Sequence, residues 1–283
     1  MKRTFFVIAM VLSLAGCGQA SKAPQAEAET GAEAVPASNN EVKVLQVENG
    51  LKVTWLQDVG RKQARSIFAD ASDALVDSLG LQDGVPSTIS AFLVEKDGMQ
   101  ILFDTGLGRK AGRVLPLLDS LGIRTADVDY LYLTHLHGDH IGGMLDGDKL
   151  EFPNATVFVS RTEYEGWMAM PDDKKAQVVK TFDAYKKQLR LFEFGDVLPG
   201  GVLSINAVGH TPGHTVYQLG RLLVIGDLIH GAALQLVDLN ICPSFDMDKE
   251  ASTASRKRIL QYAHDNGLLM AGMHLPAPAF LER

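Results

Sequence analysis

Cysteine is scarce in this chain, with only Cys17 and Cys242 among 283 residues. One pair cannot form the multi-bridge framework of a disulfide-rich domain, so a packed core has to supply the stability. Basic residues are too few for a nucleic-acid binder, because 34 Asp and Glu outnumber 27 Lys and Arg and the formal charge is -7. Apolar runs are short, and none reaches the about 20 residues of a membrane-spanning helix. With 46% hydrophobic residues, the chain can still bury one substantial core.

The N-terminus has the pattern of an export signal. Lys2 and Arg3 precede an apolar core from Phe5 to Leu14, and small residues follow it. The ending Leu-Ala-Gly-Cys resembles the bacterial lipobox, which implies that Cys17 carries lipid and begins the mature chain; an ordinary cleaved signal is the alternative. We therefore expect a signal at residues 1–16 and an exported, membrane-anchored lipoprotein on the periplasmic side of a bacterial membrane.

The segment 17–40 is rich in Ala, Glu, Gly, Pro and Ser and has almost no large apolar side chain. Such a segment cannot bury enough surface to order itself, so we expect a flexible tether. No further break and no internal repeat follows, which predicts one domain over residues 41–283. If Cys17 is lipidated, Cys242 has no disulfide partner and is expected to be a small buried residue.

Apolar periodicity predicts strands and helices along the whole domain. Two strand pairs are expected first, 42–47 with 51–55 and 87–94 with 100–103, because Asn49-Gly50 and Asp97-Gly98 suit tight turns. The later patterns predict helices at 114–121, 163–168, 174–191 and 251–264, and strands at 128–133, 155–159, 202–208, 216–219, 222–225 and 268–271.

The densest polar motif is the segment 134–143, which reads Thr-His-Leu-His-Gly-Asp-His-Ile-Gly-Gly. His135 and His137 alternate on the end of an expected strand, so their side chains point to one side. The glycine that follows lets the chain turn, so that Asp139 and His140 can return toward the same point. Imidazole nitrogen and carboxylate oxygen suit zinc, and also manganese or iron, so the motif indicates a metal site.

Other polar residues also follow expected strands. One motif reads Gly-His-Thr-Pro-Gly-His-Thr, so two imidazoles, His210 and His214, compete for one role. Asp227 follows the strand at 222–225, and His274 follows the last expected strand. Asp104 also ends a strand, and we expect it either to orient a metal ligand or to cap its own turn.

The order and spacing of these motifs resemble the metallo-β-lactamase superfamily over residues 41–283. The resemblance implies an α/β fold, an αββα sandwich of two mixed sheets with helices on the outer faces and metals at one edge. It implies two divalent ions, with zinc expected and manganese, cobalt or iron as alternatives. The ligands it implies are His135, His137 and His214 for one ion, Asp139, His140 and His274 for the other, and Asp227 as the bridge. By the same resemblance, His210 stabilises the loop or orients a neighbour, or else replaces His214 as the ligand.

Asp227 favours one class of reaction within that family. By resemblance, β-lactamases use Cys in this region or lack the bridging carboxylate, whereas lactonases, thioesterases and organophosphate hydrolases carry it. The residues of the motifs are most similar to those of the methyl parathion hydrolase branch, which resembles quorum-quenching lactonases in activity. We therefore expect a metal-dependent hydrolase that cleaves an ester, lactone or phosphotriester with a metal-bridging hydroxide. A β-lactamase is the alternative enzyme, and a non-catalytic metal- or ligand-binding lipoprotein is the alternative from another class.

Two further residues are candidates for substrate contact. His230 stands three positions after Asp227, where the lactonases have Tyr, and it could donate to an oxyanion or protonate a leaving group. We count it as substrate-binding and, with Asp139, as catalytic; a role among its neighbours is the alternative. Trp167 occupies the place of an aromatic pocket wall, with a core position as the alternative. The expected partners are a small-molecule substrate, a membrane reached through the lipid anchor and, left open, a second copy in a homodimer, but no nucleic acid.

Overall fold

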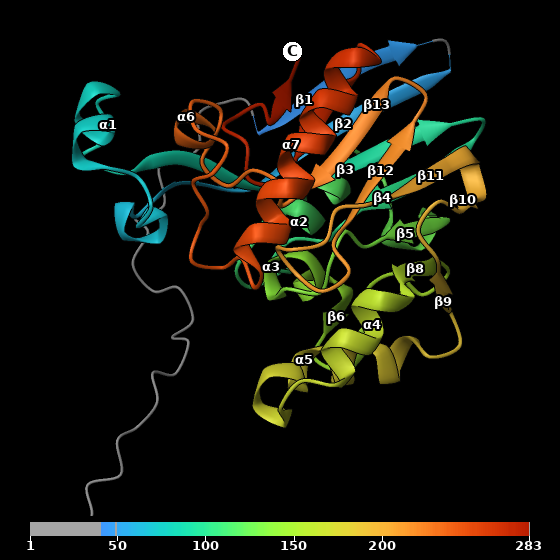
Figure 1. Cartoon of the computed structure of the whole chain (residues 1–283). Helices are drawn as coiled ribbons and strands as arrows, with labels where there is room; N and C mark the ends of the chain where they lie inside the picture. The colour runs from blue at the N-terminus through green and yellow to red at the C-terminus, as the bar shows by residue number, and fades with distance from the viewer. Residues whose placement is uncertain (1–40, 49, 283) are drawn as a thin grey trace, which may run out of the picture. The chain divides into compact units, whose positions relative to one another are not determined.

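A computed structural model describes residues 41–48 and 50–282 of the chain (Figure 1). The expected signal, tether and lipidated Cys17 lie outside these residues. Within the described ranges, no helix combines the length and the apolar character that crossing a membrane requires. Two large β-sheets, a two-stranded hairpin and several helices make up the described fold.

The first sheet has seven strands among the described residues, in the order β1-β2-β3-β4-β5-β8-β9. Its strands are β1 (Val42–Glu48), β2 (Leu51–Gln63), β3 (Val85–Lys96), β4 (Met99–Phe103), β5 (Tyr130–Tyr132), β8 (Thr156–Ser160) and β9 (Leu189–Phe192). β1 to β4 pair antiparallel, and β4, β5, β8 and β9 pair parallel, so the sheet is mixed. A small hairpin, β6 (Leu145–Asp146) with β7 (Lys149–Leu150), stands apart from it.

The second sheet has six strands in the part of the chain that the structure describes, in the order β10-β11-β12-β13-β14-β15. The strands are β10 (Val197–Leu198), β11 (Val202–Asn206), β12 (Thr215–Leu219), β13 (Leu222–Gly226), β14 (Leu269–Gly272) and β15 (Phe280–Leu281). β13 and β14 pair parallel, while the other neighbours pair antiparallel. This sheet is therefore mixed as well.

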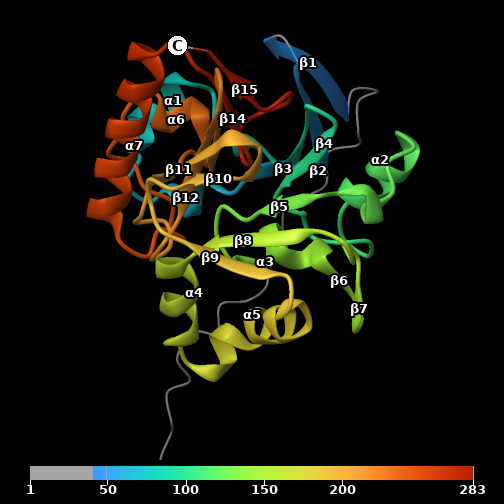
Figure 2. The same ribbon diagram turned by 90° about the vertical axis from the view of Figure 1, so that its right-hand side faces the viewer.

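The helices of the described residues are α1 (Asp73–Ser78), α2 (Val114–Ser120), α3 (Gly138–Ile141), α4 (Arg161–Met168), α5 (Asp172–Tyr185), α6 (Ala232–Gln235) and α7 (Lys249–Asp265), with short 3-10 turns at Arg65–Phe68, Thr125–Asp127, Gly142–Met144 and Pro199–Gly201. α2 and α5 pack on the first sheet and α7 packs on the second, so each sheet has helices on its outer face (Figure 2). One core lies between the sheets and continues under α7, where Ile259 and Leu260 are buried. A second core joins α2 and α5 to the first sheet, with Leu118 and Phe182 among its residues. The predicted αββα sandwich is confirmed.

Several predicted elements differ from the structure in length. β2 extends to Gln63 and forms a long antiparallel pair with β3, because the alternation of buried side chains continues past Trp55. The predicted helix at 174–191 is wrong at its C-terminal end. α5 ends at Tyr185, and Leu189–Phe192 forms β9, which pairs parallel with β8. Pairing with a neighbouring strand, which a single segment does not reveal, overrides the helical pattern there.

Candidate metal centre

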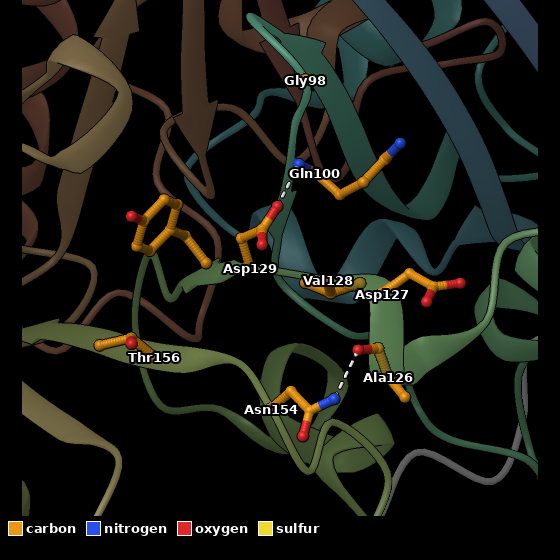
Figure 3. A pocket seen from close by; sticks show the side chains of 9 residues that line it. Gly98, Gln100, Ala126, Asp127, Val128, Asp129, Asn154 and Thr156 are labelled. Carbon is orange, nitrogen blue, oxygen red and sulfur yellow. Dashed lines mark hydrogen bonds between the residues drawn. The ribbon is translucent and has the colours of Figure 1, made fainter.

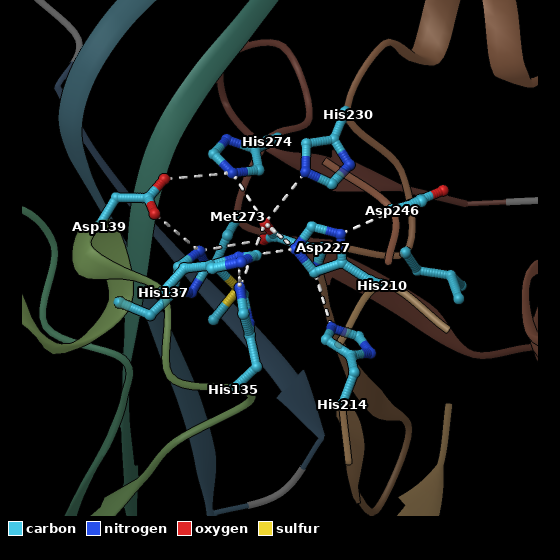
Figure 4. Close-up of polar contacts among 12 residues, drawn as sticks. His135, His137, Asp139, His210, His214, Asp227, His230, Asp246, Met273 and His274 are labelled. Carbon is cyan, nitrogen blue, oxygen red and sulfur yellow. Dashed lines mark hydrogen bonds and ion pairs between the residues drawn. The ribbon is translucent and has the colours of Figure 1, made fainter. Parts of the chain in front are cut away.

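The predicted polar residues meet where strands of both sheets end (Figure 4). The loop after β5 runs into α3, and the loops after β11, β13 and β14 approach it from the second sheet. A hydrogen bond from the backbone N–H of Thr215 to the carbonyl of Thr134, at 2.9 Å, joins the two sheets beside this point. The site therefore lies at an edge shared by the two sheets. There, loops that are distant in the sequence lie next to one another.

One group of potential ligand atoms contains His135, His137, His210 and Asp227, and these atoms lie within 4.8 Å of one another. His137 Nδ1 is 2.9 Å from His135 Nε2 and 3.0 Å from His210 Nε2. Asp227 Oδ2 lies 3.3 Å from His210 Nε2 and 3.6 Å from His135 Nε2. Three imidazole nitrogens and one carboxylate oxygen thus face a common point, as the ligands of a zinc ion do.

A second group contains Asp139, His140 and His274. His274 Nε2 is 3.4 Å from Asp139 Oδ2 and 3.0 Å from Asp227 Oδ2. His140 Nε2 is 3.2 Å from the other oxygen of Asp227, Oδ1. Asp227 therefore stands between the two groups: Oδ2 faces His210 of the first group and His274 of the second, while Oδ1 faces His140. A carboxylate in contact with both groups fits one that bridges two ions.

The buried atoms in the cluster fit a metal ion better than they fit each other. His140 Nε2 and Asp227 Oδ1 lie 3.2 Å apart, but neither makes a hydrogen bond within the described residues, and buried polar atoms without a hydrogen bond are rare in proteins. Burial lowers the pKa of His137 to about 3, so its imidazole is neutral and can act as a ligand. Burial alone would raise the pKa of Asp227, but the nearby imidazoles, His140 first, hold it well below the usual value. A neutral imidazole and an ionised carboxylate are the forms that divalent metals bind.

In His274 and His140, the ring nitrogen that points away from the cluster makes a hydrogen bond. His274 Nδ1 lies 2.7 Å from the carbonyl of Thr88, and a carbonyl can only accept, so the proton is on Nδ1 and Nε2 faces the cluster with its lone pair. His140 Nδ1 lies 2.6 Å from Asp104 Oδ2, which also accepts from the hydroxyl of Thr134 at 2.7 Å. Asp104 therefore orients a cluster residue, the first of the two roles expected for it.

The structure contradicts the prediction that His214 is a ligand and His210 is not. His210 belongs to the first ligand group, whereas both ring nitrogens of His214 are used by the backbone. His214 Nε2 accepts from the N–H of Asp227 at 2.9 Å, and Nδ1 donates to the carbonyl of Ala207 at 3.2 Å. The reason lies in Gly209, whose φ of 129° and lack of a side chain let the loop approach the backbone of Ser252 in α7 and turn His210 inward.

Glu163 in α4 holds the two histidine loops together. Its carboxylate accepts from the backbone N–H of Leu136 at 3.0 Å and from that of Gly213 at 2.7 Å. It also accepts from Trp167 Nε1 at 2.7 Å. Trp167 is buried in the core, the alternative position, and its ring is perpendicular to that of His137, with the ring centroids 5.5 Å apart. Contact of Trp167 with a substrate stays a prediction.

His230 lies inside the cluster, as its proximity to Asp227 in the sequence suggests. Its Nε2 is 3.1 Å from Asp227 Oδ2, and its ring packs against that of His274. Burial lowers the pKa of His230 to about 4, so the ring is neutral, and its Nδ1 has no hydrogen-bond partner among the described residues. Phe245, which no sequence motif marks, is half-buried with its ring centroid 5.7 Å from that of His230.

The cluster is partly exposed. His137 and Asp139 are half-buried, and the side chain of Asp139 is 21% exposed, whereas the other ligands are buried. A separate hollow lies near the N-terminal ends of β5 and β8, where residues that include Asp129 and Asn154 line it (Figure 3). The histidine loop follows the C-terminal end of β5, so this hollow is not part of the metal centre.

A family model and several known proteins are similar to this chain. A family model described as the metallo-beta-lactamase superfamily matches residues 84–270. The N-acyl homoserine lactonase AiiA of Bacillus thuringiensis subsp. kurstaki is 29% identical over 199 residues, which cover 59% of this chain and 73% of that protein. The uncharacterized protein YobT of Bacillus subtilis (strain 168) is 29% identical over 154 residues, and the match spans 52% of this chain and 63% of YobT, less than two thirds of its length.

Two solved structures are similar over most of the chain. AidC, described as a dizinc quorum-quenching lactonase in complex with a product, superposes with a TM-score of 0.77 at 26% identity and covers 84% of this chain and 92% of AidC. The hydrolase AbOPH, described as a member of the beta lactamase superfamily, gives a TM-score of 0.78 at 28% identity and covers 87% of this chain and 94% of AbOPH. The similarity therefore extends over both sheets.

Proposed function

The chain belongs to the metallo-β-lactamase superfamily, and on that premise we propose that it is a two-metal hydrolase whose substrate is a lactone or a related ester. One observation carries the proposal: the carboxylate of Asp227 faces both groups of ligand atoms, with His210 at 3.3 Å on one side and His140 at 3.2 Å on the other. The similarity to proteins described as lactonases supports the choice of substrate class. A phosphotriester is the other substrate that the same centre would accept.

Seven side chains would hold the two ions. They are His135, His137 and His210 on one side, Asp139, His140 and His274 on the other, and Asp227 between them. Zinc is the metal we propose, because N and O donors suit it and AidC is described as a dizinc enzyme. Bound there, divalent ions would polarise a carbonyl oxygen and lower the pKa of water.

His230 and Phe245 are placed to act on a substrate in this centre. The neutral imidazole of His230 directs Nε2 toward the middle of the cluster, so an N–H there would donate to the oxygen that gains charge when the ester is attacked. Phe245 lies beside that imidazole and would pack against an apolar substituent of the substrate. Asp139 is half-buried, so the product would leave past this residue.

Metal analysis combined with a substrate panel tests the proposed function. The purified protein should bind about two ions per chain and hydrolyse acyl-homoserine lactones with a higher kcat/KM than p-nitrophenyl esters, paraoxon-type triesters or β-lactams. His210→Ala should lose metal, while His264→Ala should not, since His264 is exposed on α7. Turnover of β-lactams alone would replace the proposal by a β-lactamase. A two-metal protein that hydrolyses nothing on the panel would be a metal- or ligand-binding protein.

We also propose that Cys17 is lipidated and holds the exported protein on a membrane, which rests on the lipobox-like sequence that ends at this residue. Expression of the full chain in a Gram-negative host should put the protein in the membrane fraction. Cys17→Ser should move it to the soluble periplasmic fraction or block its processing. An identical distribution of the two proteins would contradict lipidation.

A further inference from the structure

A buried carboxylate behind the metal centre distinguishes the two histidines of the Gly-His-Thr-Pro-Gly-His-Thr motif. Asp246 lies in the loop before α7, and its Oδ1 is 2.9 Å from His210 Nδ1. The corresponding nitrogen of His214 has the carbonyl of Ala207 as its partner instead. The two imidazoles therefore differ in the partner of Nδ1. A charged carboxylate holds Nδ1 of His210, whereas a neutral carbonyl holds Nδ1 of His214.

Asp246 is itself held by α7. Its Oδ2 accepts from the hydroxyl of Ser252 at 2.7 Å and from Arg256 Nη2 at 3.3 Å. Arg256 is fully buried, and its guanidinium also donates to the carbonyl of Leu228, next to Asp227, at 2.9 Å. A buried guanidinium keeps its charge and needs an opposite charge beside it, so Arg256 stabilises the ionised form of Asp246.

We propose that Asp246 is the positioning residue that makes His210 a metal ligand, by accepting the Nδ1 proton and so directing the Nε2 lone pair toward His137 and Asp227. A carboxylate behind a ligand imidazole fixes its tautomer and its orientation and raises its basicity. The proposal rests on the two-metal centre of the proposed function, and it concerns metal affinity rather than the substrate.

Two backbone hydrogen bonds join the two loops independently of the Asp246 side chain. The N–H of Met247 donates to the carbonyl of His210 at 3.2 Å, and the N–H of Asp248 donates to that of Gly209 at 2.8 Å. These bonds do not involve the side chain at position 246. Removal of the carboxylate therefore should leave the loops paired and free the imidazole of His210 to rotate, which separates positioning from folding.

The test is metal binding by the full chain without substrate. The metal-free protein, D246A and D246N are titrated with zinc against a chromophoric chelator, and the visible spectrum of the cobalt(II) form is recorded. D246A should lower the affinity for one of the two zinc ions by about 10- to 100-fold and leave the affinity for the other unchanged. It should also change the cobalt bands of the affected ion. D246N keeps an oxygen that can accept from His210 and should lose less affinity.

Ser244→Ala serves as the matched control, because Ser244 is exposed in the same loop and its backbone N–H, which the substitution retains, is bonded to Ile67. It should bind both ions like the wild type. Unchanged zinc affinity and cobalt bands in D246A, or an equal loss at both ions, would overturn the assignment. If D246A does not fold, unchanged affinity in D246N overturns it. Failure of the proposed hydrolase would appear differently, as intact metal binding without turnover.

Discussion

The imidazole of His230 is stacked on that of His274, with ring centroids 4.7 Å apart and an angle of 25° between the planes. Phe at position 230 could keep this stacking but has no N–H. If His230 donates to a developing oxyanion, His230→Phe should lower kcat for lactones by about 10²- to 10³-fold, with a smaller change in KM. Steady-state kinetics on a lactone series measures both constants.

The number of bound metals serves as the control for His230→Phe. Because the seven proposed ligands do not include His230, the variant should still bind about two ions per chain. Loss of one ion would show that His230 acts as a ligand instead of a hydrogen-bond donor. An unchanged kcat/KM on every hydrolysed substrate would remove His230 from the reaction.

Glu163→Ala should destabilise the protein strongly. The substitution leaves the N–H groups of Leu136 and Gly213 and the Trp167 Nε1 without their acceptor, and each unpaired buried donor costs about 1–3 kcal/mol. We expect the free energy of unfolding of the metal-free protein to fall by at least about 3 kcal/mol, as measured by urea unfolding. Metal affinity should fall as well, because both histidine loops lose their common anchor.

Glu165→Gln is the control on the same helix. Glu165 has a side chain that is 65% exposed and only a loose contact with Arg161 at 3.8 Å. Its substitution should change the free energy of unfolding by no more than about 0.5 kcal/mol. Equal destabilisation by the two variants would indicate that α4, rather than the carboxylate of Glu163, supports the loops.

Phe245→Ala should reduce selectivity for substrates with apolar substituents. The half-buried ring lies next to His230, so its loss removes apolar surface that a substituent would cover. We expect KM to rise more for long-chain than for short-chain acyl lactones, while kcat changes little. A uniform effect over a series of acyl lengths would place the substituent elsewhere.

Local sequence predicted most of the centre because it is built from strand ends. His135, His137, Asp139 and His140 occupy one short motif, and alternation plus one turn suffices to bring them together. Asp227 also follows an apolar strand directly, and it lies where the pattern places it. In each case the residues that determine the position lie within a few residues of the ligand.

The choice between His210 and His214 could not be predicted in this way. Both imidazoles belong to the same turn, and the carboxylate that orients His210, that of Asp246, lies 36 residues further along the chain. No motif marks Asp246, so only the tertiary structure shows which imidazole it contacts. The helix predicted at 174–191 failed for the same reason, since the pairing of β9 with β8 joins segments that are distant in sequence.

Metal-dependent stabilisation should increase with pH between about 6.5 and 9. Without metal, burial alone would lower the pKa of His210, but Asp227 and Asp246 raise it to about 9. A raised pKa means that the stability contributed by the proton is fully present below the unfolded value of about 6.5 and is lost as pH rises through about 9. Metal binding competes with that proton, so it becomes more favourable over the same range. Asp227 does not oppose this trend, because its pKa is held low and its contribution is lost only in acid.

Thermal unfolding with zinc and with a chelator at several pH values measures the difference in Tm. A constant difference from pH 6.5 to 9 would contradict protonation of His210 in the metal-free protein.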